Sequence, residues 1–252
     1  MVGALVKTAF LRDRRRAPPP AALPFAREVR FEGNTGARIA ARWFPAVQPK
    51  GAVVLAHPDK RLAKAWFERE GHVAWLHEHG YDVLTFDFPG YGASRGPATY
   101  YHEDVLAAFR FARDWSGMLP VHVWGVSMGA FAAANASPHL DGCGALVLES
   151  PYPNFNSWYG DRKEARVMQA FDKWFPRSSR AIQADKNVAD AAARRILVAL
   201  AEEDEITPVA LSERVANAAP QDKTQVVRVA GKHFAPFKDE GFRARVLNTI
   251  AA

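Results

Sequence analysis

Several features that would place the chain in other classes of protein are missing from its 252 residues. The sequence has one cysteine, Cys143, so no disulfide can form within the chain. No apolar run approaches the roughly 20 residues that a membrane-spanning helix requires. Internal repeats and long low-complexity tracts are also missing. We therefore expect a globular protein of a reducing compartment, the cytoplasm.

A strong excess of charge of one sign is missing as well. The 33 Lys and Arg residues against 27 Asp and Glu leave a net charge of +6. Residues 1–20 hold five basic residues and one acidic residue, so most of this excess lies in a short N-terminal segment. The rest of the chain is nearly balanced, which argues against nucleic acid as a partner.

The first 26 residues differ from the rest and predict a basic amphipathic arm followed by a proline-rich linker. Apolar side chains recur at helical spacing in the first ten residues, an arginine cluster follows, and Pro18-Pro19-Pro20 forbids the helix to continue. The arm is expected to fray or to pack on the body. A second interpretation is peripheral contact with a membrane through residues 1–16.

From residue 27 onward, short apolar segments alternate with segments of helical periodicity. Residues 27–33 and 37–44 alternate polar and apolar side chains, which predicts an antiparallel pair of strands. Residues 52–57 form an unbroken apolar run, typical of a strand buried on both faces. This alternation predicts one α/β domain, 27–252, built on a parallel sheet. Further strands are expected at 82–87, 121–126, 145–150, 195–200 and 224–230, and helices at 61–79, at 101–116, from Ser127, from about Pro208 and at the C-terminus.

A serine lies between two glycines where the strand at 121–126 gives way to a helix. The segment GVSMG at 125–129 matches G-x-S-x-G in the strand–turn–helix context that gives the pattern its meaning. A sharp turn there would raise the Ser127 hydroxyl above the sheet edge. Side chains two positions to either side would collide, so glycine is needed at both. We predict that Ser127 is a nucleophile.

A serine hydroxyl needs a base to take its proton, and a histidine oriented by a carboxylate can serve. His233 follows the last predicted strand, where a loop can carry it over the sheet. Asp204 follows the strand at 195–200, at the same edge. We therefore predict a catalytic triad of Ser127, His233 and Asp204. Other carboxylates that could serve as the acid are Glu149, Glu202, Glu203 and Glu205.

The remaining histidines and the cysteine are expected to have structural roles. His72, His77 and His79 share the helix at 61–79 and lack the H-E-x-x-H spacing of a zinc site. We expect them at the surface or at the helix C-terminus. Cys143 is expected in the core. The sequence has no motif for a metal or an organic cofactor, and we expect none.

These segments resemble the α/β-hydrolase superfamily, and within it the small serine hydrolases that include esterases, lysophospholipase-like enzymes and abhydrolase-domain thioesterases. The likeness covers about 29–252 and rests on LAHPD, FDFPGYGASRG, GVSMGA, LVLESPY, AEEDEITPV and GKHF, in that order. It implies the α/β-hydrolase fold: a mostly parallel eight-stranded sheet, helices on both faces and a small cap, here at about 152–190. The order Ser127, Asp204, His233 is also that of the superfamily.

The resemblance further implies an oxyanion hole made of two backbone N–H groups. One is expected from Met128, after the nucleophile, and the other from the loop after residues 52–57. The superfamily usually has H-G-x there, whereas this chain has His57-Pro58-Asp59. Proline has no N–H, so Asp59 is the predicted donor and Lys60 its alternative. His57 and the turn containing Asp87 are expected to brace these loops.

The resemblance implies a small acyl ester or thioester as substrate, with a lipid-like acyl chain as the more specific hypothesis. Tyr152, Trp158 and Tyr159 in the cap are predicted to contact it, although they could equally pack the cap onto the body. A serine aminopeptidase or an acyltransferase would use the same triad. A non-catalytic binding protein of this fold is the third alternative.

Overall fold

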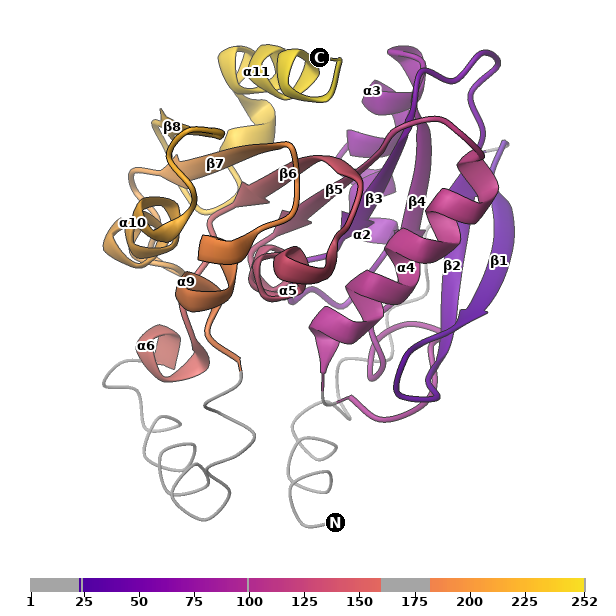
Figure 1. The fold of residues 1–252 in the computed structure, drawn as a ribbon, viewed down its shortest axis with the longest axis horizontal. Helices are drawn as coiled ribbons and strands as arrows, with labels where there is room; N and C mark the ends of the chain where they lie inside the picture. Colours follow the sequence, from indigo (N-terminus) through magenta and orange to yellow (C-terminus); the bar gives the residue numbers. More distant parts are fainter. Residues whose placement is uncertain (1–22, 24, 99, 160–181, 252) are drawn as a thin grey trace.

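The computed structural model describes residues 23, 25–98, 100–159 and 182–251, and its centre is one eight-stranded sheet (Figure 1). The strand order is β1-β2-β4-β3-β5-β6-β7-β8. The strands are β1 (Arg27–Glu32), β2 (Arg38–Phe44), β3 (Ala52–Ala56), β4 (Asp82–Phe86), β5 (Val121–Val126), β6 (Cys143–Glu149), β7 (Arg195–Ala201) and β8 (Thr224–Val229). All eight predicted strands are confirmed, with ends that shift by one or two residues.

The sheet is mostly parallel, as predicted. Strands β3 to β8 pair in parallel, while β2 is antiparallel to both β1 and β4. Because β5 lies between β3 and β6, the turn that follows it is in the middle of the sheet's carboxyl edge. From β3 the chain passes to β4 on one side and then to β5 on the other, and α/β proteins commonly bind ligands at the carboxyl edge beside such a reversal of strand order.

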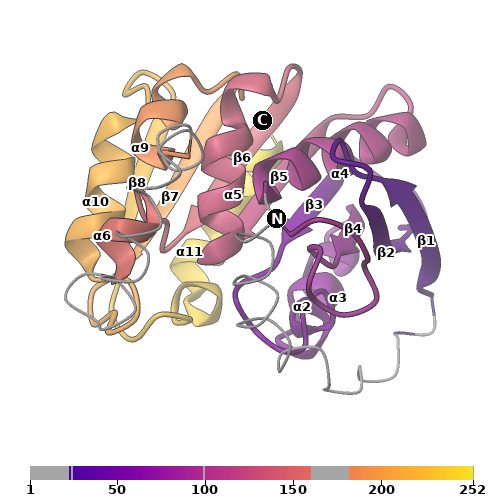
Figure 2. The same cartoon turned by 90° about the horizontal axis from the view of Figure 1, so that it is seen from below.

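Helices cover both faces of the sheet (Figures 1 and 2). Two separate hydrophobic clusters correspond to the two faces, and β3 shows the division: Val54 joins the first cluster, and Val53 and Leu55 join the second. The helices on the first face are α4 (Tyr101–Ser116), α5 (Met128–Ala136) and α10 (Val209–Ala218), and those on the second are α2 (Ala65–Arg69), α3 (His72–Glu78) and α11 (Glu240–Ala251).

Short segments complete the description of the first face. The helices α6 (Phe155–Tyr159) and α9 (Ala184–Asn187) lie beside α5 and α10. The 3₁₀ turns are η1 (Ser137–His139), η2 (Val188–Asp190) and, near α11, η3 (Pro236–Lys238). The predicted arm at 1–16 and cap residues 160–181 lie outside the described residues, so the domain boundaries at 26/27 and 152–190 stay predictions.

One predicted helix, at 61–79, is wrong as a single element. The chain there forms α2 and α3, separated by Gly71 with a φ of 92°. This left-handed conformation is open to glycine at little cost and ends the ladder of helical hydrogen bonds. Gly80, with a φ of 83°, follows the second helix as expected.

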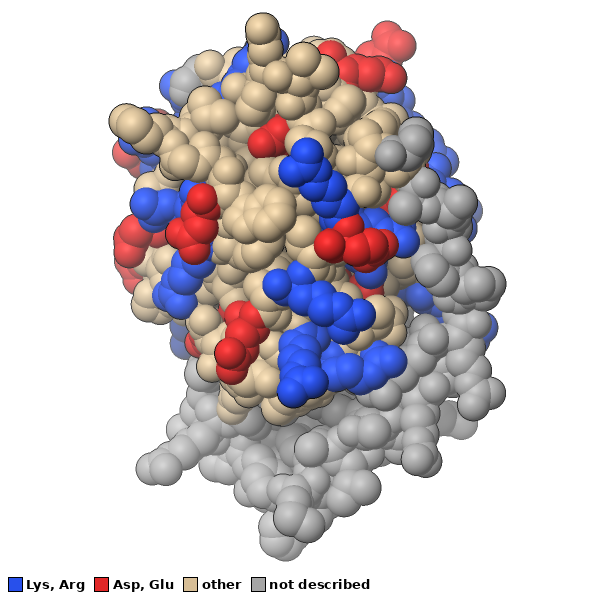
Figure 3. Space-filling model, turned by 90° about the vertical axis from the view of Figure 1, so that its right-hand side faces the viewer, with Lys and Arg blue, Asp and Glu red and all other residues tan. Residues whose placement is uncertain are grey.

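The face beside β1 carries charges of both signs. Figure 3 shows Lys and Arg side chains in its lower half with acidic side chains around them. Opposite charges also pair at a buried position of β2, where Arg42 contacts Glu28 at 2.6 Å and Glu68 at 2.7 Å. Among the described residues, none of the helices combines the length and apolar character needed to cross a bilayer.

Candidate active site

Ser127 occupies a strained turn between β5 and α5. Its φ of 55° and ψ of −114° are unusual for a residue with a side chain, and the surrounding structure must hold them. The Ser127 N–H donates to the Glu149 carbonyl at 2.9 Å, which ties the turn to the end of β6. Ser127 is 6% exposed. The turn therefore presents a hydroxyl at the carboxyl edge of the sheet.

The two glycines of the pattern are needed for the steric reason that the sequence predicts. A Cβ on Gly125 would lie 2.4 Å from the carbonyl oxygen of Gly129. A Cβ on Gly129 would lie 1.9 Å from the carbonyl oxygen of Ala56, at the end of β3. Both clashes are with backbone, which cannot rotate away. The glycines let α5 begin directly against the sheet.

His233 and Asp204 form a buried pair on the loops after β8 and β7. Nδ1 of His233 lies 2.6 Å from Oδ2 of Asp204, and both side chains are almost fully buried. The other carboxylate oxygen of Asp204 accepts the N–H groups of Ile206 at 2.9 Å and Thr207 at 2.7 Å. Nε2 of His233 is buried and makes no hydrogen bond within the described part of the chain. The pair thus leaves one imidazole nitrogen available for proton transfer.

The environment of Asp204 keeps its carboxylate ionised. Burial alone would raise the pKa of Asp204, but hydrogen bonds from His233 and Thr207 and the attraction of His233 bring the pKa below its usual value. An ionised carboxylate at Nδ1 fixes the tautomer of the imidazole and stabilises a proton on it. This is the geometry that an acid–base pair requires.

The alternative acids do not reach His233. Glu202, Glu203 and Glu205 are exposed, unlike Asp204. Glu149 is buried, but its Oε1 accepts the Nε1–H of Trp124 at 2.6 Å, on the opposite side of β6. Burial raises the pKa of Glu149 to about 8, so the group is mostly neutral at pH 7. Asp204 alone pairs with the histidine among these carboxylates.

Ser150 contacts both His233 and Asp204 and is absent from the sequence-based prediction. It follows Glu149, has a φ of 47°, and its hydroxyl lies 3.5 Å from the His233 carbonyl. It also hydrogen-bonds the Asp204 carboxylate and helps to lower the pKa of that group. The one sequence signal for Ser150 is its position at the end of a predicted strand, directly after Glu149. Ser150 holds the acid and the base near the turn at Ser127.

Tyr91 contacts the side chains of both predicted oxyanion donors, Met128 and Asp59. Met128 is the first residue of α5, so its N–H has no partner within the helix. The Asp59 side chain is turned to Tyr91, whose hydroxyl donates to Asp59 Oδ1 at 2.7 Å and lies 3.5 Å from Met128 Sδ. The N–H of Lys60 donates to the Pro58 carbonyl at 2.7 Å, which disfavours Lys60 as the second donor. Asp59 stays the prediction.

His57 and Asp87 brace the loops that carry these groups, as expected. Fully buried His57 accepts the Phe88 N–H at Nε2 (3.1 Å), so its Nδ1–H donates to the Pro58 carbonyl (2.8 Å). Burial lowers the pKa of His57, which keeps the imidazole neutral. Asp87 accepts the Lys64 ammonium at 2.7 Å and the Ala93 N–H at 2.9 Å. Neither side chain is left for proton transfer.

Of the three aromatic residues predicted to contact the substrate, two are stacked in the structure. Tyr152 is 2% exposed and stacks on Phe131 of α5, with ring centroids 4.7 Å apart and planes within 5°. Trp158 stacks on Tyr152 at 5.6 Å. The side chain of Tyr159 lies outside the described part of the structure. Packing is thus visible for two of them, and substrate contact stays a prediction for all three.

His72 is not at the surface, contrary to the prediction. It is 1% exposed and its ring stacks on Phe237 at 3.6 Å, because α3 begins inside the aromatic cluster under the sheet. Burial lowers the pKa of His72 well below its usual value. His79 does end α3, and Cys143 is buried, as expected. Within the described residues, no group of three or more His, Cys, Asp or Glu side chains is placed to hold a metal ion.

The sheet order, the turn at Ser127 and the His233–Asp204 pair define an α/β-hydrolase fold. A family model described as alpha/beta hydrolase fold matches residues 64–175. In three dimensions the chain is similar to an esterase of Pyrococcus furiosus, with a TM-score of 0.72, 18% identity, and coverage of 94% of this chain and 96% of the other. The chain belongs to the α/β-hydrolase superfamily.

Two further proteins are similar to this chain, one in sequence and one in fold. The chain is 34% identical over 194 residues to the lysophosphatidylserine lipase ABHD12 of Bos taurus, which covers 67% of this chain and 45% of the relative. This chain thus spans about half the length of the curated relative. A puromycin-hydrolyzing peptidase of Mycobacterium tuberculosis has a TM-score of 0.66 and 18% identity, over 88% of this chain and 37% of the other.

Proposed function

We propose that this chain is a serine hydrolase that cleaves carboxylic esters, with Ser127 as nucleophile, His233 as general base and Asp204 as its orienting acid. The observation that supports this most directly is the buried 2.6 Å contact between Asp204 and His233 at the same sheet edge as the strained Ser127 turn. A structural histidine would not need a buried, ionised carboxylate at one nitrogen and an unbonded nitrogen at the other.

The first half of the reaction forms an acyl-enzyme. His233 Nε2 takes the proton from Ser127 Oγ as the oxygen attacks the carbonyl carbon of the ester. The tetrahedral oxyanion is held by the backbone N–H groups of Met128 and Asp59, aided by the positive end of α5. The C–O bond to the alcohol then breaks, and His233 returns the proton to the leaving alkoxide.

The second half hydrolyses that intermediate. His233 takes a proton from water as the water oxygen attacks the acyl carbon, and the same N–H groups hold the new oxyanion. The bond to Ser127 Oγ breaks, the serine regains its proton, and a carboxylic acid leaves. The ionised Asp204 stabilises the imidazolium in both halves.

Other reactions on the same residues differ in the acceptor or in the bond cleaved. A thioester needs no change in the site, and an acyltransferase would use an alcohol in place of water as the acyl acceptor. An aminopeptidase would need carboxylates for the substrate amine, and two acidic residues of the predicted cap, Asp161 and Glu164, lie outside the described residues. The peptidase neighbour supports only the capacity of the fold for amide cleavage.

The curated relative supports a more specific candidate, a lysophospholipid. The relative acts, by its name, on lysophosphatidylserine, and the matched part covers 67% of this chain. We propose that the chain deacylates a single-chain lipid ester. Membrane contact through residues 1–16 would suit such a substrate and stays a prediction, as does a cytoplasmic location.

The test is the release of fatty acid from lysophosphatidylserine and lysophosphatidylcholine, and of p-nitrophenol from p-nitrophenyl butyrate. Turnover of any of these, reduced by at least about 10³-fold in Ser127→Ala, supports the ester hydrolase. Turnover of butyrate but of neither lipid keeps the hydrolase and excludes the lysophospholipid. Cleavage of an aminoacyl p-nitroanilide in place of the esters would favour the peptidase.

A further inference from the structure

An acidic side chain lies in the loop where the proposed reaction needs a donor for a negatively charged oxygen. Asp59, whose N–H is the predicted second oxyanion donor, also carries a carboxylate. A negative charge near the oxyanion of the tetrahedral intermediate would repel it. At about 6 Å and an effective dielectric constant of about 20, such a repulsion slows a reaction step by roughly 10²-fold. The reaction therefore requires that this carboxylate be held away from the oxyanion.

The carboxylate of Asp59 is hydrogen-bonded to a buried tyrosine. The hydroxyl of Tyr91 donates to Asp59 Oδ1 at 2.7 Å. Tyr91 is 1% exposed, whereas Asp59 is half-buried. A hydrogen bond to a carboxylate is about twice as strong as one between neutral groups. The bond thus restrains the Asp59 side chain toward the turn after β4.

The same hydroxyl lies against the neighbour of the nucleophile. It is 3.5 Å from Sδ of Met128, the residue that follows Ser127 and supplies the first predicted oxyanion donor. Because one oxygen makes both contacts, the side chains of the two predicted donors lie next to a single hydroxyl group. Tyr91 therefore lies beside the predicted oxyanion hole, although it is no member of the predicted triad.

The position of the hydroxyl is fixed by the fold around the turn after β4. Gly92 follows Tyr91 with a φ of 44°, and a Cβ on that glycine would lie 2.1 Å from a carboxylate oxygen of Asp87. Asp87 also accepts the Lys64 ammonium at 2.7 Å, which ties the turn to the segment after Asp59. These contacts hold the tyrosine in place before any substrate binds.

The ring of Tyr91 packs independently of its hydroxyl. Its centroid lies 5.0 Å from that of His57 and 6.4 Å from that of Tyr101. A phenylalanine at position 91 would keep both contacts and fold in the same way. The hydroxyl, by contrast, contacts Asp59 and Met128. Its removal therefore isolates the interaction with the carboxylate from the packing of the ring.

We propose that Tyr91 is a positioning residue for ester hydrolysis, and that its hydroxyl holds the Asp59 carboxylate away from the oxyanion. The proposal rests on the ester hydrolase proposed above. Tyr91 transfers no proton and forms no bond to the substrate, since it acts through Asp59. The oxyanion exists in the tetrahedral intermediates and develops in the transition states that lead to them, so the effect falls on the chemical steps and not on substrate binding.

The test measures kcat and KM for p-nitrophenyl butyrate. We expect Tyr91→Phe to lower kcat and kcat/KM alike, by at least about tenfold, with KM changed less than about threefold. Asp59→Asn in the same chain removes the charge that Tyr91 restrains. The double variant should therefore have a kcat within about threefold of that of Asp59→Asn alone.

The matched control is Tyr81→Phe, which removes the same hydroxyl from another buried tyrosine. Tyr81 directly precedes β4, so it lies at the opposite edge of the sheet from the turn that carries Tyr91. This control should change kcat less than about twofold, the effect expected far from the reacting groups. Labelling with a fluorophosphonate counts the active sites in each preparation, so that misfolded protein does not enter kcat.

The outcomes separate the two proposals. If the wild-type protein hydrolyses no ester, the proposed function fails and the role of Tyr91 fails with it. If esters are hydrolysed but Tyr91→Phe keeps the wild-type kcat, the role of Tyr91 is overturned and the hydrolase stands. The same holds if Tyr91→Phe lowers kcat by the same factor with aspartate or asparagine at position 59, because a merely structural hydroxyl would be needed in both.

Discussion

Nδ1 of His233 lies 2.6 Å from Oδ2 of Asp204, although the two residues are 29 positions apart along the chain, with α10 and β8 between them. The pair is buried beneath the loops after β7 and β8, and Ser150 contacts both members. Three adjacent glutamates are exposed and do not compete. The selection of one carboxylate out of a run of four follows from burial and hydrogen bonding.

Removal of the charge on Asp204 should therefore disable the site. We expect Asp204→Asn to lower kcat for ester hydrolysis by about 10³–10⁴-fold, because the amide favours the wrong imidazole tautomer. The matched control is Glu205→Gln, an exposed neighbour that contacts Lys232 at 3.7 Å and should change kcat less than threefold, about the effect of a weak surface ion pair. Steady-state kinetics on a soluble ester measure both. Equal losses in the two variants would contradict the assignment of the acid.

The close approach of α5 to β3 predicts a strict requirement for glycine. Gly129→Ala would place a Cβ 1.9 Å from the Ala56 carbonyl oxygen, and we expect a loss of at least about 2 kcal/mol in the free energy of unfolding. Gly241→Ala in α11 is the control, since the nearest atom there is a side-chain oxygen of Asp239 at 3.1 Å. Urea unfolding followed by circular dichroism gives both values. A Gly129→Ala protein as stable as the control would show that the turn relaxes easily.

The buried Glu149 predicts a stability that falls as the pH rises. Burial raises its pKa to about 8 in the folded state, against 4.5 for an ordinary glutamate. Between these two values the folded protein retains a proton that the unfolded chain has lost. Stability from this group is thus fully present below about pH 4.5 and is lost by about pH 8, at up to about 1.4 kcal/mol per pH unit.

Glu149→Gln should remove this dependence, because an amide accepts the Trp124 N–H without titrating. We expect the variant to gain stability relative to the wild type as the pH rises from 5 to 8. Its ester hydrolysis should persist, since Glu149 is not part of the proposed triad. Unfolding free energies at several pH values measure the effect. The same slope in both proteins would mean that Glu149 is ionised in the folded state.

His72 predicts an opposite dependence at acid pH. Burial lowers its pKa well below 6.5, so the unfolded chain binds a proton that the folded protein excludes. Stability from the neutral ring is fully present above about pH 6.5 and is lost as the pH falls toward the folded pKa. His72→Phe should keep the stack on Phe237 and resist acid better than the wild type. Identical acid unfolding curves for the wild type and His72→Phe would contradict this prediction. His122, with a pKa of about 4, contributes the same part of the slope to both proteins.

Much of this structure could be predicted from local patterns. Each of the eight strands is a short apolar or alternating segment, and the segments of Ser127, Asp204 and His233 follow three of them, so topology brings their loops to one edge. The break at Gly71 was missed because a single glycine within a helical pattern does not reveal its φ. The surface prediction for His72 failed because the helical pattern gives no sign of which partner covers that face.

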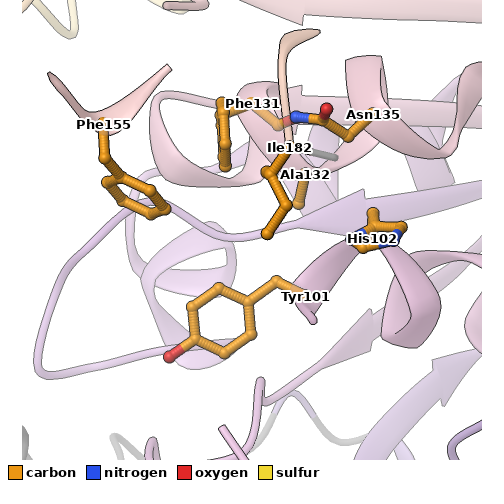
Figure 4. A pocket seen from close by; sticks show the side chains of 7 residues that line it. All are labelled: Tyr101, His102, Phe131, Ala132, Asn135, Phe155 and Ile182. Carbon is orange, nitrogen blue, oxygen red and sulfur yellow. The ribbon is translucent and has the colours of Figure 1, made fainter. Parts of the chain in front are cut away.

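The remaining features depend on contacts between distant segments. Ser150 and Tyr91 acquire their roles only when the end of β6 lies beside the loop of His233 and the loop after β4 lies beside Asp59. A small pocket brings residues 101 and 182 together against α5 (Figure 4), and no local pattern in the sequence predicts that contact. Spacing along the chain identifies the reacting groups more readily than the walls that surround them.

The central claim is that Ser127 is the nucleophile, and covalent labelling tests it most directly. A fluorophosphonate probe should label the wild-type protein and the control Ser157→Ala, a serine of α6 outside the triad, with one probe per chain by mass spectrometry. Ser127→Ala should not be labelled, because the phosphonate ester forms only on a serine activated by His233. Equal labelling of Ser127→Ala and wild type, or no labelling of the folded wild-type protein, would contradict the account.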